Sequence, residues 1–191
     1  MISMNDFINN ITSAGLSRDV NLIRKAFFFA KERHAGQMRK FSDDPYFLHP
    51  VRVGLLLRDF DDEVIIAGLL HDVLEDTETT VRELEEQFGS NITLLVLGCT
   101  KDPERGTPVE ILRRAAEQDS RVIYVKLADR ADNLQDDPAN LKVSTVENYV
   151  NQTPLILELA SEHGITFLVG EIQDRIGKLK IGRKRCRTKS D

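Results

Sequence analysis

The sequence predicts an all-α fold. Apolar residues recur at helical spacing through most of the 191-residue chain, and no segment shows the clear alternation of a half-buried strand. The chain contains no internal repeat, low-complexity block or Pro/Gly-rich linker. This length suits one domain with a substantial hydrophobic core. We therefore expect a single domain over residues 1–177, followed by a basic, solvated tail over residues 178–191.

Capping residues and glycines mark the expected helices. The first covers residues 18–36 with Gly36 as its stop, and a loop over 41–50 precedes a helix through 51–60. Thr80, with a glutamate three residues later, forms the sequence pattern of a capping box for a helix that ends at a glycine. The following segments are expected to be a short helix over 91–101, a loop over 102–108, a helix over 144–164 that Pro154 kinks or breaks, and a closing segment over 166–182.

Two segments decide the architecture. Residues 61–76 begin with acidic capping candidates and carry apolar residues on all sides, which predicts one central, buried helix. Residues 120–136 are ambiguous, because their first half is rich in Val, Ile and Tyr and could form a strand. The second half favours a helix, in which Asp129 and Asn133 share a face. We predict a helix.

Composition limits the class of protein. The chain has no apolar run of transmembrane length and no signal peptide at its start, so we expect no membrane partner. Two cysteines, Cys99 and Cys186, fit a core thiol and a tail thiol in a reducing cytoplasm. The net charge is −5, and the seven basic residues between positions 178 and 189 lack interleaved aromatics. We therefore expect no nucleic-acid partner.

An acidic cluster follows the predicted central helix. His71, Asp72, Glu75 and Asp76 would share an arc of roughly 140° on a helix of about 3.6 residues per turn. Three carboxylates on one arc require a cation or bound protons. An imidazole with carboxylate oxygens suits Mn, Fe or Zn. His71 and Asp72 are then candidate ligands, and the other two carboxylates remain to handle a water molecule.

One helix seldom completes a metal site. His49 precedes a predicted helix, and Asp129 lies in an apolar stretch where an unpartnered carboxylate is costly, so both are further candidate ligands. A core histidine and a solvated helix end remain alternatives for the individual residues of the cluster. His34 and His163 each stand close to a glycine at a helix end, and capping explains them.

Four motifs of the sequence together resemble those of a known family. "HAGQMRK", "DPYFLHP", "AGLLHDVLEDTETT" and "YVKLADRADNL" occur in this order, and the combination resembles the HD-domain hydrolases of the RelA/SpoT type. The resemblance covers roughly residues 20–165 and implies an HD-domain helical bundle. It also implies a small alarmone hydrolase, which removes the 3′-pyrophosphate from guanosine tetra- or pentaphosphate to give GDP or GTP.

The resemblance assigns roles to ten residues. It implies one divalent metal, usually Mn²⁺, held by His49, His71, Asp72 and Asp129. It implies that Glu75 and Asp76 activate or position the attacking water. The residues that it places around the nucleotide are Arg39 and Lys40 near the phosphates, and Tyr46 and Asn133 lining the pocket.

Some residues depart from the family pattern. The family usually has a glycine after the Arg-Lys pair, whereas this chain has "RKFSDDPY" with Asp43 and Asp44. Two extra negative charges near a phosphate site leave the substrate open. The alternatives are an HD phosphohydrolase acting on an adenine alarmone, a nucleoside monophosphate or NADPH, and a non-catalytic nucleotide-binding module. From the residues alone, Arg39 and Lys40 are a surface basic pair and Tyr46 is a packing residue.

Overall fold

The structure is a bundle of helices. The computed structural model describes residues 2–13, 17–40, 43–137 and 140–187, with side chains described as far as Leu179. Within this part of the chain the only β feature is an isolated antiparallel bridge between Met38 and Pro45. The expected all-α class is confirmed. The helices in chain order are α1 (Met4–Thr12), α2 (Val20–Arg33), α3 (Leu48–Leu56), α4 (Asp62–Leu70), α5 (Val73–Asp76), α6 (Val81–Phe88), α7 (Ser90–Cys99), α8 (Pro108–Gln118), α9 (Val122–Asn133), α10 (Val143–Glu162) and α11 (Val169–Arg187).

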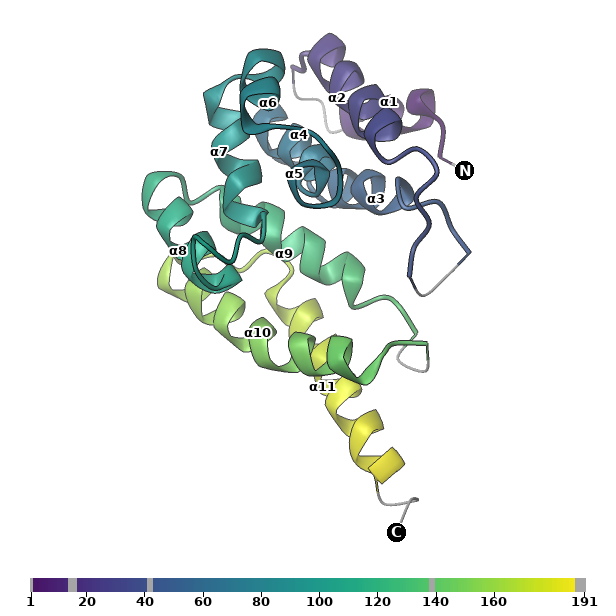
Figure 1. Ribbon diagram of the computed structural model, residues 1–191, viewed down its shortest axis with the longest axis vertical. Coiled ribbons are helices and arrows are strands. Elements are labelled where there is room, and N and C mark those ends of the chain that lie inside the picture. The colour runs from purple at the N-terminus through teal and green to yellow at the C-terminus, as the bar shows by residue number, and fades with distance from the viewer. Residues whose placement is uncertain (1, 14–16, 41–42, 138–139, 188–191) are drawn as a thin grey trace.

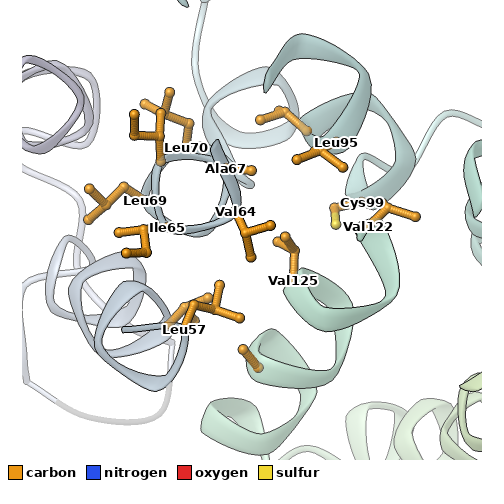
Figure 2. Close-up of a cluster of buried hydrophobic side chains, with 14 of the residues drawn as sticks. Leu57, Val64, Ile65, Ala67, Leu69, Leu70, Leu95, Cys99, Val122 and Val125 are labelled. Carbon is orange, nitrogen blue, oxygen red and sulfur yellow. The ribbon is translucent and has the colours of Figure 1, made fainter. Parts of the chain in front are cut away.

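Helix α4 occupies the centre. It packs against α2, α3, α7 and α9, and every residue from Val64 to Leu70 is buried. Figure 2 shows its side chains radiating on all sides into the core, with Leu95 of α7 and Val125 of α9 nearby. Helices α1 and α2 lie on one side of the molecule and α10 and α11 on the other, with α9 between the two groups (Figure 1). The predicted burial of this segment is confirmed.

The predicted continuous helix over 61–76 is wrong in one respect. Helix α4 ends at Leu70, and the four-residue helix α5 starts at Val73. The His71 ring Nδ1 donates to the carbonyl of Gly68 at 2.9 Å, and Asp72 has φ −103° and ψ −4°. The side chain of His71 thus bonds a carbonyl of the last turn of α4, and such a bond competes with the backbone hydrogen bonds that would continue the helix. The acidic cluster therefore does not lie on one continuous helix.

The other boundaries follow the sequence with local differences. The ambiguous segment is helix α9, as predicted. Helix α2 ends at Arg33, before Gly36, whose φ is +76°. Thr80 accepts from the Glu83 amide at 3.2 Å, but the Glu83 carboxylate pairs with Arg33, so only half of the expected capping box forms.

Further differences concern helices α1, α8, α10 and α11. Helix α10 runs without interruption from Val143 to Glu162 although Pro154 lies inside it, so of the two expected outcomes at this proline, a kink or a break, the break does not occur. Helices α1 and α8 were not predicted, and each starts with a complete capping box. Helix α11 continues through residues 178–187 of the expected tail, whose side chains from 180 onward lie outside the description. Residues 41–42 of the "RKFSDDPY" turn also lie outside it.

Glycines let α3 and α4 approach closely. A Cβ on Gly68 of α4 would lie 2.6 Å from Leu57 Cδ1 and 3.5 Å from the Gly54 Cα of α3. A Cβ on Gly54 would lie 3.1 Å from the Phe7 ring. The absence of side chains at Gly54 and Gly68 therefore determines how closely the two helices pack.

Two expectations from the composition, a core thiol and no membrane span, can be compared with the structure. Cys99 is buried, as expected of a core thiol, and burial raises the pKa of its thiol to about 12. Across the described ranges, the helices are either too short or too polar to cross a lipid bilayer.

We predict that Gly98→Ala destabilises the fold. A Cβ on Gly98 would lie 2.6 Å from both Ala115 Cβ of α8 and Val122 Cγ2 of α9, and this overpacking should cost about 1–3 kcal/mol. Gly177→Ala is the matched control, because it has open space around it in the interior of α11 and should be neutral or stabilise by up to about 1 kcal/mol. Urea unfolding of both variants measures the difference, and equal midpoints would contradict the packing argument.

Candidate metal centre

Two imidazoles meet at the junction of α3, α4 and α9. His49 lies in the first turn of α3 and His71 directly follows α4, and their Nε2 atoms are 3.1 Å apart. Both side chains are almost completely buried. Asp72 Oδ2 lies 3.0 Å from His71 Nε2 and 3.5 Å from His49 Nε2. The ligand atoms of these three residues all lie within 4.8 Å of one another, which is a spacing that a single cation can bridge.

Asp129 approaches the same point from α9. Its Oδ1 lies 3.4 Å from His49 Nε2 and 3.6 Å from His71 Nε2. Its other oxygen accepts from Lys126 Nζ at 2.8 Å, and Asn133 Nδ2 donates to Oδ1. The structure thus brings together all four predicted ligands, with Asp129 contacting both imidazoles from outside the compact group of three.

The hydrogen bonds that the two Nδ1 atoms make determine which nitrogen of each ring carries the proton. His71 Nδ1 donates to the Gly68 carbonyl, and His49 Nδ1 donates to Asp132 Oδ2 at 2.7 Å. In neutral rings each Nε2 then carries a lone pair, and the two lone pairs face each other. This arrangement is repulsive unless a proton or a metal ion lies between them. The donor set therefore fits a divalent cation.

The pKa shifts of the cluster also indicate that positive charge stabilises it. Burial lowers the histidine pKa values, but the surrounding carboxylates outweigh it, raising that of His49 well above its usual value and that of His71 to about 9. Burial raises the pKa values of Asp72 and Asp129, but His71 for the first and Lys126 for the second hold them well below their usual range. A bound cation would supply the positive charge that the imidazoles otherwise acquire as protons.

A cleft of about 610 Å³ opens beside this cluster. All the predicted catalytic and substrate-binding residues line it, together with Asp72 and Asp129 of the cluster. His49 and His71 lie behind it, each about 1% exposed. The sequence reasoning did not find the polar wall that α10 contributes, namely Ser144, Thr145, Asn148, Tyr149 and Gln152.

The catalytic candidates have different surroundings. Glu75 accepts from the Lys101 amide at 3.0 Å and forms an ion pair with the Lys101 side chain. The Tyr46 hydroxyl lies 2.6 Å from Asp72 Oδ2 and 3.0 Å from Asp76 Oδ2. Burial, followed by the charge of Asp72, raises the pKa of Asp76. A carboxylate with a raised pKa beside a candidate metal site is suited to accept a proton.

The predicted phosphate contacts also differ. Lys40 is exposed at the cleft, whereas Arg39 is only 8% exposed. Arg39 donates to Asp136 Oδ2 at 2.7 Å and lies 3.8 Å from Asp132 Oδ2. Tyr46 packs against His34, with ring centroids 5.0 Å apart, while its hydroxyl binds the carboxylates. Tyr46 is therefore both a packing residue, through its ring, and a residue that lines the cleft.

His34 and His163 lie outside the cluster, as expected. His34 caps α2 and contacts Gln37 Oε1 through Nδ1 at 2.9 Å. His163 caps α10, and its Nδ1 donates to the Leu159 carbonyl at 3.0 Å.

Asp132 was not identified from the sequence. Its side chain is fully buried, and besides His49 it accepts from Arg52 Nε at 2.6 Å and Arg52 Nη2 at 3.0 Å. The available signal was its position three residues after Asp129 on the same helix, within one turn of a candidate ligand. Asp132 holds the His49 ring in the orientation that presents Nε2 to the cluster.

The fold and the site together define a class of protein. Its members are helical bundles that carry a buried His/Asp cluster where three helices meet. The chain belongs to the HD domain family, whose sequence model matches residues 26–165. It is 45% identical over 121 residues to "Guanosine-3′,5′-bis(diphosphate) 3′-pyrophosphohydrolase" of Aquifex aeolicus, over 59% of this chain and 17% of that protein. It is 34% identical over 177 residues to "GTP pyrophosphokinase" of Myxococcus xanthus, over 82% of this chain and 22% of that protein.

A solved structure resembles the fold over almost its whole length. The protein is described as a metazoan ortholog of SpoT that hydrolyzes ppGpp, and the match has a TM-score of 0.69 at 23% identity. It covers 88% of this chain and 98% of that one. The resemblance to HD domains of the RelA/SpoT type is therefore confirmed. The chain spans about a fifth of the length of the two relatives named above.

We predict that Asp132→Asn weakens metal binding about 10- to 100-fold, because the charge behind His49 is lost. Calorimetric titration of the metal-free protein with Mn²⁺ measures this effect without any assay of activity. Asp136→Asn is the matched control, because Asp136 also binds Arg39 but does not contact His49 in the described contacts. Circular dichroism establishes that both variants are folded. Equal Mn²⁺ affinity in the two variants would show that Asp132 does not position His49.

Proposed function

We propose that this chain is a metal-dependent hydrolase that removes the 3′-pyrophosphate from guanosine tetra- or pentaphosphate. The observation that carries the proposal is the pair of facing imidazole Nε2 atoms, 3.1 Å apart, beside a cleft lined by carboxylates and cations. The name of the Aquifex relative and the described activity of the metazoan protein support this choice of substrate. The product is GDP or GTP.

The proposed ligands are His49, His71, Asp72 and Asp129, and the proposed metal is Mn²⁺, with Fe or Zn as alternatives. A mixed imidazole and carboxylate set suits these ions. Such an ion, when bound, supplies Lewis-acid polarisation of phosphate and lowers the pKa of water.

The reaction breaks the linkage between the pyrophosphate and the ribose 3′ oxygen. The hydroxyl of water goes to phosphorus, and a proton ends on the 3′ oxygen. Asp76 is suited to take a proton from the water because its pKa is raised. Glu75 is held by Lys101 and is suited to orient the water. Lys40 on the cleft offsets the charge of the displaced pyrophosphate.

A nucleotide with less phosphate charge is the second candidate substrate. Arg39, which the family resemblance places near the phosphates, is ion-paired with Asp136 and lies close to Asp132. Part of the cationic charge of the cleft is therefore neutralised within the protein. This observation favours a less charged ligand, such as a nucleoside monophosphate or NADPH.

We predict that the purified chain with Mn²⁺ releases pyrophosphate from guanosine tetraphosphate. A panel containing guanosine tetraphosphate, an adenine alarmone, nucleoside monophosphates and NADPH, assayed for both pyrophosphate and orthophosphate, separates the two candidates. Metal removal by a chelator should abolish turnover, and Mn²⁺ should restore it. Intact guanosine tetraphosphate alongside cleavage of another nucleotide would reject the leading proposal.

We also predict that Glu75→Gln and Asp76→Asn each lower kcat by at least about 100-fold. A general base such as Asp76 contributes roughly 10²–10⁴ to the rate, and a misplaced water in the absence of the Glu75 carboxylate costs about 10²-fold. Both variants should retain metal, as measured by elemental analysis. His71→Ala is the comparison and should lose both turnover and metal. Full activity of either carboxylate variant would remove that residue from the mechanism.

A further inference from the structure

Arg130 is a buried cation that forms no ion pair with any residue that the structure describes. The residue is only 4% exposed, and its Nε and Nη1 atoms have no hydrogen-bond partner among the described residues. Nη2 donates to Gln152 Oε1 at 3.5 Å, at the outer limit of hydrogen bonding. A buried guanidinium in this state costs free energy, because it has left water without a matching anion.

The neighbours of Arg130 compensate this charge only in part. Its guanidinium lies over the Tyr149 ring, 4.8 Å from the ring centroid, which contributes a cation–π attraction. The preceding residue, Asp129, is already occupied by Lys126 and Asn133 and contacts both imidazoles.

Arg130 forms part of the cleft wall. Gln152 and Tyr149, the two residues of α10 that hold the guanidinium, line the cleft together with Arg130. Successive residues on a helix point about 100° apart, so α9 presents Asp129 to the imidazoles and Arg130 to α10. An anion at Arg130 is therefore near the metal cluster but distinct from a group bound by it.

Two cations of the cleft differ from the others in their ion pairing. Arg39, Lys101 and Lys126 are each paired with a carboxylate. Of the cleft cations, Lys40 and Arg130 form no ion pair within the described ranges, and they lie on different elements, the loop after α2 and helix α9. Such a pair matches a ligand that carries two separate phosphate groups.

We propose that Arg130 binds the phosphate group of the substrate that is not cleaved, the 5′-diphosphate of a guanosine bis(diphosphate). This inference rests on the proposed function for the identity of the nucleotide. Hydroxyl and amide groups of Thr145 and Asn148 on α10 line the same cleft and can donate further hydrogen bonds to this diphosphate. The buried charge of Arg130 is thus retained in the free protein for use in binding.

The test compares GDP with guanosine, which differ only in the 5′-diphosphate. Calorimetric titration of the full chain in a chelator measures both affinities without metal or turnover. Arg130→Met keeps an apolar side chain against Tyr149 but removes the charge. It should weaken GDP binding roughly tenfold to hundredfold, the usual contribution of hydrogen bonds to charged groups, and leave guanosine binding unchanged. Arg130→Lys should fall between wild type and Arg130→Met.

Thermal unfolding separates binding from a structural role. Removing an uncompensated buried charge should leave the melting temperature of free Arg130→Met equal to or above that of wild type. Arg121→Met is the matched control at the other end of α9, because Arg121 is ion-paired with Asp61, Glu63 and Asp119. It should lower the melting temperature and leave GDP affinity unchanged.

Several results would overturn the proposal. They are undiminished GDP binding by Arg130→Met, an equal loss for GDP and guanosine with a lower melting temperature, and a wild type that does not bind GDP more tightly than guanosine. Hydrolysis of guanosine tetraphosphate with Mn²⁺, measured on the same preparation, reports on the proposed function separately. Turnover without any Arg130 effect would reject the Arg130 site alone, whereas an Arg130 effect without turnover would reject only the hydrolase assignment.

Discussion

The candidate site depends on the mutual approach of two imidazole nitrogens. His49 and His71 come from different helices, and each ring is held from behind, by Asp132 in one case and by the Gly68 carbonyl in the other. Both outward bonds occupy Nδ1, so both Nε2 atoms are directed to one point, where Asp72 and Asp129 converge as well. The carboxylates, the cleft and its cations are arranged around this contact. Without it, the repulsion between Asp72 and Asp129 would lose the compensation that the imidazoles provide.

Charge in the cleft is divided between groups that are internally paired and groups that are not. Lys126 is committed to Asp129, Lys101 to Glu75, and Arg39 to Asp136. These pairs hold the carboxylates in place within a partly buried site. The remaining cations are the ones that a phosphorylated ligand can reach without breaking an existing pair. A count of basic residues in the motifs would therefore overstate the charge that is free for a ligand.

Much of the fold could be read from the sequence, because burial and helical spacing are local properties. The apolar run from Val64 to Leu70 identified the central helix. The end of that helix could not be read, since it depends on a hydrogen bond from His71 to Gly68 that spacing does not reveal. The four candidate ligands were named from residue type and motif, whereas Asp132 and Arg130 are recognised only through what surrounds them in three dimensions.

The glycines at the crossing of α3 and α4 have a consequence for the accuracy of the site. His49 begins one of these helices and His71 follows the other, so the distance between their nitrogens is a readout of how the helix axes are spaced. Gly54 and Gly68 set that spacing through contacts within the apolar core. Packing in the core and the geometry of the site are consequently coupled. A methyl group added at the crossing would push the helices apart and would move His49 and His71 out of alignment.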